Sequence, residues 1–128
     1  MLAPAGLKVV QEFWRLMATN DFQSVGAVLS ADFVLEWPQT NERIRGAERF
    51  ARMNHEYPAQ GVWKFAVNRI VAGEGEAVSD VTVTDGVQVS RAISFFTIEE
   101  GKIRRIVEFW PEPCAPASDR SHLAEALN

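Results

Sequence analysis

Two glutamates, Glu36 and Glu108, each precede an aromatic residue in a segment that alternates like a β-strand. If both carboxyl groups face one apolar cavity, burial and mutual repulsion raise the pKa of at least one of them. A protonated carboxyl beside an ionised one can move a proton on or off carbon. The same alternation then predicts the side chains that share this cavity: Val34, Ser90, Ala92, Ser94, Phe96, Ile106 and Trp110.

A second interpretation of the same glutamates stays open. A strand glutamate is usually solvated or paired, so one or both would form exposed cross-strand pairs with arginines such as Arg104 or Arg105. Asp80 and Arg91, on neighbouring strands, are expected to point outward as an ion pair at the surface or at a dimer interface.

Aromatic residues flank both candidate carboxyl groups. Trp37, Trp63 and Trp110 are candidate walls for a flat ligand, with core packing as the alternative, whereas Trp14 sits in a helical apolar stripe and is expected in the core. His55 and Tyr57 end a helical segment, where His55 would relay a proton and Tyr57 would donate to a developing enolate oxygen. The other possibility is that His55 lies on a solvated face.

The composition excludes several classes of partner. With two histidines, one cysteine and no glycine-rich phosphate loop, we expect no metal and no cofactor. The net charge of −4 gives no attraction to nucleic acid or anionic lipid. No apolar run reaches the roughly 18 residues that would span a membrane. These features favour a cytoplasmic protein without nucleic-acid or membrane partners.

The periodicity predicts one α+β domain over residues 1–128. Apolar residues at three- and four-residue spacing predict helices over 7–17, 22–29 and the segment from Gly46 to Tyr57. Residues 39–45 are expected to form a loop. Alternation and turn signals, of which Asp85-Gly86 is the sharpest, predict strands at 33–37, 62–71, 77–84, 87–98 and 103–110. Helices packed on one face of an antiparallel sheet follow, with residues 111–128 as an extended tail that ends in a weak helix.

This order of elements, with Glu36-Trp37-Pro38, Arg45-Gly46 and the run from Gly101 to Trp110, resembles the nuclear-transport-factor-2-like superfamily, and more narrowly its SnoaL-like, polyketide-cyclase-like branch. The resemblance implies a cone-shaped, cystatin-like fold: three N-terminal helices on a strongly bent antiparallel sheet, a deep apolar cavity, and homodimers through the outer sheet face. Both faces of the last two strands are largely apolar, so a partner subunit or the tail should cover the outer face. We expect a homodimer.

Members that resemble limonene epoxide hydrolase carry a Tyr and an Asn two apart before a proline, and an Asp on the closing strand. The matching positions here are Val34, Glu36 and Glu108, so the Tyr is absent. The Arg and Asp that this family carries on a middle strand correspond to Val81 and Val83. Epoxide hydrolysis by that set of residues is therefore not expected.

Three functions fit the sequence. The first is a cofactor-independent isomerase, cyclase, dehydratase or hydrolase that acts on a small apolar or polycyclic molecule. The second is a non-catalytic carrier or sensor with the same pocket, and the third is a dimeric interaction module. The candidate catalytic residues are Glu36, Glu108, His55 and Tyr57, and the candidate substrate-binding residues are Trp37, Trp110, Val34, Ser94, Phe96, Ile106 and Trp63.

Overall fold

A computed structural model describes residues 3–128, so the first two residues of the expected domain lie outside the described part. Within it, helix α1 spans Ala5–Ala18, a 3₁₀ segment spans Phe22–Val28, and helix α2 spans Ala47–Glu56. The strands are β1 (Leu29–Trp37), β2 (Glu42–Arg45), β3 (Lys64–Ala72), β4 (Glu76–Thr84), β5 (Val89–Glu99) and β6 (Lys102–Phe109). The expected α+β class is confirmed.

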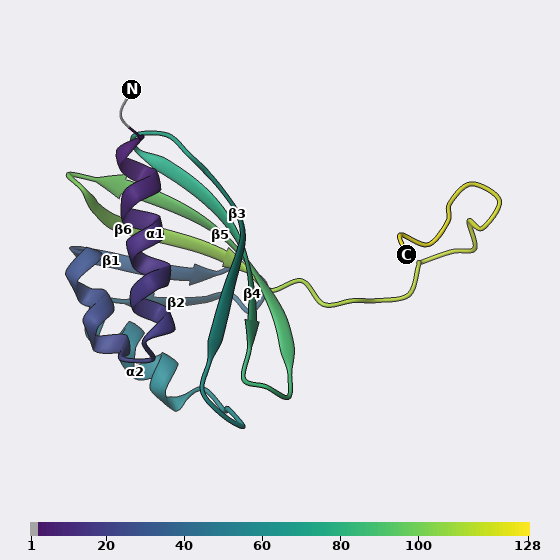
Figure 1. Ribbon diagram of the computed structural model, residues 1–128, viewed down its shortest axis with the longest axis horizontal. Helices are drawn as coiled ribbons and strands as arrows, with labels where there is room; N and C mark the ends of the chain where they lie inside the picture. The colour runs from purple at the N-terminus through teal and green to yellow at the C-terminus, as the bar shows by residue number, and fades with distance from the viewer. Residues whose placement is uncertain (1–2) are drawn as a thin grey trace.

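The six strands form one sheet in the order β2-β1-β6-β5-β4-β3. The sheet bends around α1, which lies across its concave face, while the 3₁₀ segment and α2 close one end of the cone (Figure 1). All neighbours pair antiparallel except β1 and β6, which run parallel. The expectation of a purely antiparallel sheet was therefore wrong at this pair. Strand β6 reaches β1 only after the hairpin-linked strands β3, β4 and β5, and it then runs in the same direction as β1.

Two short elements differ from the expected pattern. The second expected helix is a seven-residue 3₁₀ segment, since Gly26 and two valines disfavour α-helix in so short a stretch. The expected loop 39–45 contains β2, a polar edge strand whose Arg43 pairs with Glu36 of β1. Apolar periodicity does not detect a four-residue strand in which three residues are charged.

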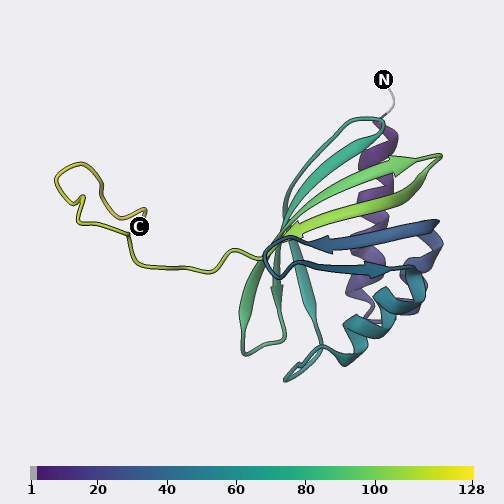
Figure 2. The ribbon, with the colours of Figure 1, turned by 180° about the vertical axis from the view of Figure 1, so that it is seen from behind.

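Residues 111–128 form an extended tail that runs away from the domain (Figures 1 and 2). The weak helix expected at its end is reduced to a turn at residues 121–123. A short helix needs packing for stability, and every residue of this tail is exposed.

The core lies between α1 and the concave face of the sheet. Phe13 of α1 contacts Phe96 of β5 and Phe50 of α2, with ring centroids 5.5 Å and 6.0 Å apart. Gly6 permits the start of α1 to approach the β3–β4 turn, because a Cβ there would lie 2.4 Å from the Gly73 carbonyl oxygen. This contact fixes α1 over the sheet.

No helix within residues 3–128 has the length and apolarity to cross a membrane.

The convex face of the sheet carries a group of apolar side chains, which we call the outer patch. Strand register places its members side by side on three strands: Val78, Ile93, Phe95, Val107 and Phe109. Phe95 is 46% exposed, and its ring packs edge-on against that of Phe109. Asp80 and Arg91 form the expected outward ion pair beside the patch, and Arg91 holds the pKa of Asp80 at about 2.

Candidate functional site

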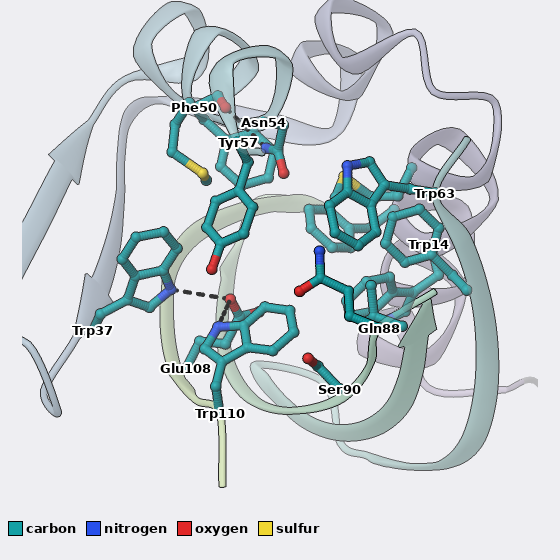
Figure 3. Close-up of a pocket in the computed structure, with 15 residues that line it drawn as sticks. Trp14, Trp37, Phe50, Asn54, Tyr57, Trp63, Gln88, Ser90, Glu108 and Trp110 are labelled. Atoms are coloured by element: carbon teal, nitrogen blue, oxygen red, sulfur yellow. Dashed lines mark hydrogen bonds between the residues drawn. The ribbon is translucent and has the colours of Figure 1, made fainter. Parts of the chain in front are cut away.

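A pocket opens between the concave face of the sheet and the helices (Figure 3). Counted out to its open mouth and with the solvent space there included, it has a volume of about 700 Å³. Eight of its fifteen lining residues are aromatic. The lining consists of Phe13, Trp14, Met17, Trp37, Phe50, Met53, Asn54, Tyr57, Trp63, Phe65, Val83, Gln88, Ser90, Glu108 and Trp110.

Glu108 is the carboxyl group in this pocket, and it is 7% exposed. Its Oε1 accepts hydrogen bonds from the indole Nε1 atoms of Trp37 and Trp110, both at 3.1 Å (Figure 3). Its Oε2 accepts a hydrogen bond from the Ser94 hydroxyl at 2.7 Å. Burial raises the pKa of Glu108 above its ordinary value, and the three hydrogen bonds oppose that rise.

The local sequence accounts for this arrangement. Ser94 and Glu108 are directly opposed on β5 and β6, so their side chains share the concave face. Trp110 follows Glu108 by two residues and therefore returns to the same side. Trp37 ends β1, the strand next to β6, and its ring reaches the carboxyl group from the other flank.

Glu36 lies on the opposite face of the sheet, and the expected pair of carboxyl groups in one cavity was wrong. Register pairs Glu36 with Val107, one residue away from Glu108, and with Arg43. The Nε atoms of Arg43 and Arg105 lie 2.7 Å and 2.6 Å from the Glu36 carboxylate oxygens. These arginines lower the pKa of Glu36.

The alternative of an exposed ion pair with Arg105 is therefore the correct one for Glu36. Val34 shares this convex side, where it pairs with Arg45 and Arg105, so the prediction that it lines the cavity was also wrong. Alternation shows which residues of one strand share a face, but it does not match that face to a strand about 70 positions away.

The other candidate residues divide into two groups. Tyr57, Trp63, Trp37 and Trp110 line the pocket, and the Tyr57 and Trp63 rings lie edge-to-face with centroids 6.1 Å apart. The remaining candidates lie outside the lining. Ser94 donates a hydrogen bond to Glu108, and Phe96 and Ile106 are buried in the core. His55 packs against Phe22, with ring centroids 5.1 Å apart. The expected proton relay by His55 therefore has no support in the geometry.

Trp14 packs in the core, as its helical stripe predicts, and its indole Nε1 donates to the Ser79 hydroxyl at 3.1 Å. Its ring also forms the inner wall of the pocket. Asn54 also lines the pocket, at the helix end where it was expected with His55 and Tyr57. Gln88 is a lining residue that sequence reasoning did not select, because it follows the Asp85-Gly86 turn and no pattern distinguishes it from an ordinary surface amide.

The pocket rim is held together by Asp85, which is buried. Its carboxylate accepts the backbone N–H groups of Gln60, Val87 and Gln88 at 2.7, 3.0 and 2.9 Å, and the Gln88 side-chain amide at 3.0 Å. These donors hold the pKa of Asp85 well below its ordinary value.

Across residues 3–128, no three His, Cys, Asp or Glu side chains form a group that could hold a metal ion.

A family model described as the SnoaL-like domain matches residues 10–106. A candidate ketosteroid isomerase from Kribbella flavida is similar at 30% identity, with a TM-score of 0.88 over 97% of this chain and 90% of that one. An NTF-2 like protein of unknown function from Burkholderia xenovorans is 18% identical, with a TM-score of 0.79 over 97% and 96%. An LEH-like epoxide hydrolase from M. tuberculosis is 22% identical, with a TM-score of 0.67 over 84% and 83%. No curated protein matches the sequence.

Proposed function

The chain belongs to the SnoaL-like domain family, and from that premise we propose that it is a cofactor-independent enzyme of the isomerase type with a small, largely apolar substrate. The observation that carries this proposal is the position of Glu108. It is a buried carboxyl group held by three donors at the wall of an aromatic pocket, and burial raises its pKa. Such a group is a stronger base than an exposed glutamate once ionised.

A single carboxylate suffices for an isomerisation. Ionised Glu108 takes a proton from carbon beside a C=O or C=N bond, the electron pair of the C–H bond forms a C=C bond, the π pair of the C=O or C=N bond moves to the oxygen or nitrogen, and Glu108 returns the proton to another carbon. The Tyr57 hydroxyl points towards the same space (Figure 3) and can donate a hydrogen bond to the developing charge. The likeness to a candidate ketosteroid isomerase supports this reaction class.

A specific observation favours a second function, that of a carrier or sensor. Two indole N–H groups already engage Oε1 of Glu108, and they lower its basicity while they fix its orientation. A carboxylate held in this way anchors the polar end of a ligand without any transfer of a proton. In this function the same molecules bind, but no proton is exchanged at carbon.

A two-stage experiment separates the functions. A thermal-shift screen of steroids, polyketide-like aromatics and terpenoids identifies molecules that raise Tm. Proton NMR of those molecules in D2O then shows whether the protein moves a hydrogen between carbons, seen as new product signals, or exchanges it for deuterium; we call either result exchange at carbon. We expect exchange with the wild type, and loss of at least about 100-fold in its rate with Glu108→Gln.

Glu36→Gln is the matched control, because the same change is made on the opposite face of the sheet. It should retain exchange. Binding without exchange would support the carrier instead, and an absence of binding by every class would contradict both functions.

We further propose a cytoplasmic location, consistent with the free, exposed Cys114, and a homodimer formed through the outer patch.

A further inference from the structure

Over residues 3–128, the pocket lining carries a single charge, and that charge is negative. Glu108 is the only charged side chain among the lining residues within the described part of the chain, and no lysine, arginine or histidine accompanies it. The faces of the eight aromatic rings are electron-rich and attract cations, and the thioethers of Met17 and Met53 are polarisable. The electrostatic field in the hollow therefore favours a positive ligand.

The two amides of the pocket present their oxygens to it. The Nε2 of Gln88 donates to the Asp85 carboxylate at 3.0 Å and to the Pro58 carbonyl at 3.4 Å, and both of these groups accept hydrogen bonds only. The Nδ2 of Asn54 donates to the Phe50 carbonyl at 2.9 Å. Because their nitrogens are held in this way, both side-chain oxygens point into the hollow (Figure 3).

Three of the indole N–H groups in the wall are already used. Trp14 donates to Ser79, and Trp37 and Trp110 donate to Glu108, so these residues offer the ligand ring surface and no free N–H group. The hydroxyls of Tyr57 and Ser90 can donate or accept as needed. Three of the groups with fixed orientation are thus acceptors, namely the Glu108 carboxylate, the Gln88 Oε1 and the Asn54 Oδ1, while the indole N–H of Trp63 donates to no group within residues 3–128.

From these three observations we infer that the ligand carries a positively charged nitrogen with at least one N–H group, as a protonated amine or imine, on an apolar or aromatic body. This inference rests on the proposed function, since both use the same pocket and an ionised Glu108. A cation beside Glu108 compensates the buried carboxylate, and its N–H group supplies the donor that the acceptors lack. A ligand with only carbonyl acceptors would find its donors in the hydroxyls of Tyr57 and Ser90 and the Trp63 indole N–H group, and it would leave the negative charge of Glu108 uncompensated.

The same placement serves the proposed reaction. On a protonated imine, the C–H bond beside the C=N bond breaks, its electron pair forms a C=C bond, and the π pair of the C=N bond moves to the nitrogen and neutralises it. Glu108 takes the proton and returns it to a different carbon. Atoms and charge balance without a co-reactant, and the cationic nitrogen is the electron sink.

Two probes of similar shape test the inference by calorimetry at pH 7.5. One is N,N-dimethylphenethylamine, which is protonated at this pH, and the other is the tertiary alcohol in which a carbinol group replaces the dimethylammonium group. We expect the amine to bind the wild-type protein at least about tenfold more tightly than the alcohol. Glu108→Gln should reduce that ratio to about one, because the amide keeps the shape and removes the charge.

Two further variants show whether a change in the binding ratio comes from the altered side chain or from misfolding. Glu36→Gln should preserve the ratio, since that carboxylate lies on the convex face. Gln88→Met, which removes an acceptor oxygen and keeps the side-chain length, should lower the ratio severalfold. Equal binding of the two probes, binding of neither, or a preference that survives Glu108→Gln would overturn the inference.

The outcome separates this inference from the proposed function. If neutral carbonyl compounds bind and exchange deuterium while the amine shows no preference, the ligand class is wrong and the isomerase stands. If the amine is preferred but no bound molecule exchanges hydrogen at carbon, the isomerase is wrong and the ligand class stands.

Discussion

Two opposing effects act on the Glu108 side chain. Burial disfavours its ionised form, and three hydrogen bonds from Trp37, Trp110 and Ser94 favour it. Indole N–H groups donate only, so Oε1 stays an acceptor in both protonation states and the proton of the neutral acid resides on Oε2. Oε2 lies against Ser94, whose hydroxyl can reverse its hydrogen bond when the proton arrives. The site therefore accommodates both forms without rearrangement.

A raised pKa makes the stability of the protein depend on pH in a defined direction. The folded state binds the Glu108 proton more tightly than the unfolded state, so this contribution is complete below the ordinary value of 4.5 and is lost as pH rises through the raised pKa. Glu108→Gln lacks this loss. We expect its Tm relative to the wild type to increase by about 2–6 °C between pH 4.5 and 7.5, as measured by scanning calorimetry.

Glu36→Gln provides the comparison for that measurement. Arginines lower the pKa of Glu36, so its contribution to stability is present above 4.5 and is lost in more acidic solution. The Tm of this variant relative to the wild type should therefore not increase over the same interval. A Glu108→Gln difference that is constant with pH would contradict the raised pKa.

Among single residues, the sequence predicted the aromatic side chains around Glu108 better than it predicted the position of Glu36, the carboxyl group expected beside it. Trp37, Trp63, Trp110 and Tyr57 lie where a pocket wall was expected. Glu36 was misplaced because its orientation depends on the register between β1 and β6, and that register is set by packing and not by local sequence. Gln88 could not have been selected, since its role depends on Asp85 holding its amide nitrogen.

Among the segments of the chain, the one between α2 and β3 contributes two aromatic walls to the pocket although it has no regular secondary structure. It carries Tyr57 and Trp63 and is tied at two points. Asp85 binds the Gln60 N–H group, and the side chain of Asn20 both donates to the Trp63 carbonyl at 2.8 Å and accepts from its N–H group at 2.9 Å. The rim is thus preorganised by side chains from distant parts of the chain.

Asp85→Ala should loosen this rim. We expect a lower Tm and faster hydrogen–deuterium exchange at residues 58–63 and 85–88, with little change in β6. Ligand affinity should fall severalfold, because Tyr57, Trp63 and Gln88 lose their fixed positions. The pKa of Asp85 is lowered, so the difference in stability from the wild type is present above the ordinary value of 3.8 and shrinks as pH falls below it.

Asp119→Ala is the matched control, because Asp119 makes the same kind of turn contact to Ser121 in the exposed tail. It should leave Tm, exchange and affinity unchanged. Unaltered exchange at residues 58–63 in Asp85→Ala would show that Asn20 alone holds the segment.

Most of the elements could be predicted from the sequence. Helices α1 and α2 and strands β3 to β6 lie within a few residues of their expected positions, because amphipathic stripes and turn residues are local signals. Strand β2 and the parallel β1–β6 pair could not be predicted. The first is a charged edge strand, and the second depends on contacts about 70 residues apart along the chain.

For the whole molecule, the two faces of the bent sheet have different roles. The concave face holds the pocket, and the convex face exposes the outer patch. Residues 111–128 were one candidate to cover that patch, but they extend away from the domain (Figure 2). A sheet with its convex face in water would carry polar residues there, so a second copy of the chain is the occupant that we propose.

Phe95 tests this homodimer because it lies at the centre of the outer patch, between Val78 and Val107. If the two patches meet across a twofold axis, Phe95→Arg places a charge from each chain in the same apolar interface, and burial of those charges is strongly unfavourable. Light scattering coupled to size exclusion should give twice the mass of one chain for the wild type and a single mass for Phe95→Arg. Val87→Arg, at a valine in the β4–β5 turn that is 74% exposed and lies outside the outer patch, should remain a dimer. A monomeric wild type at micromolar concentration, or a Phe95→Arg variant that stays dimeric, would contradict assembly through this face.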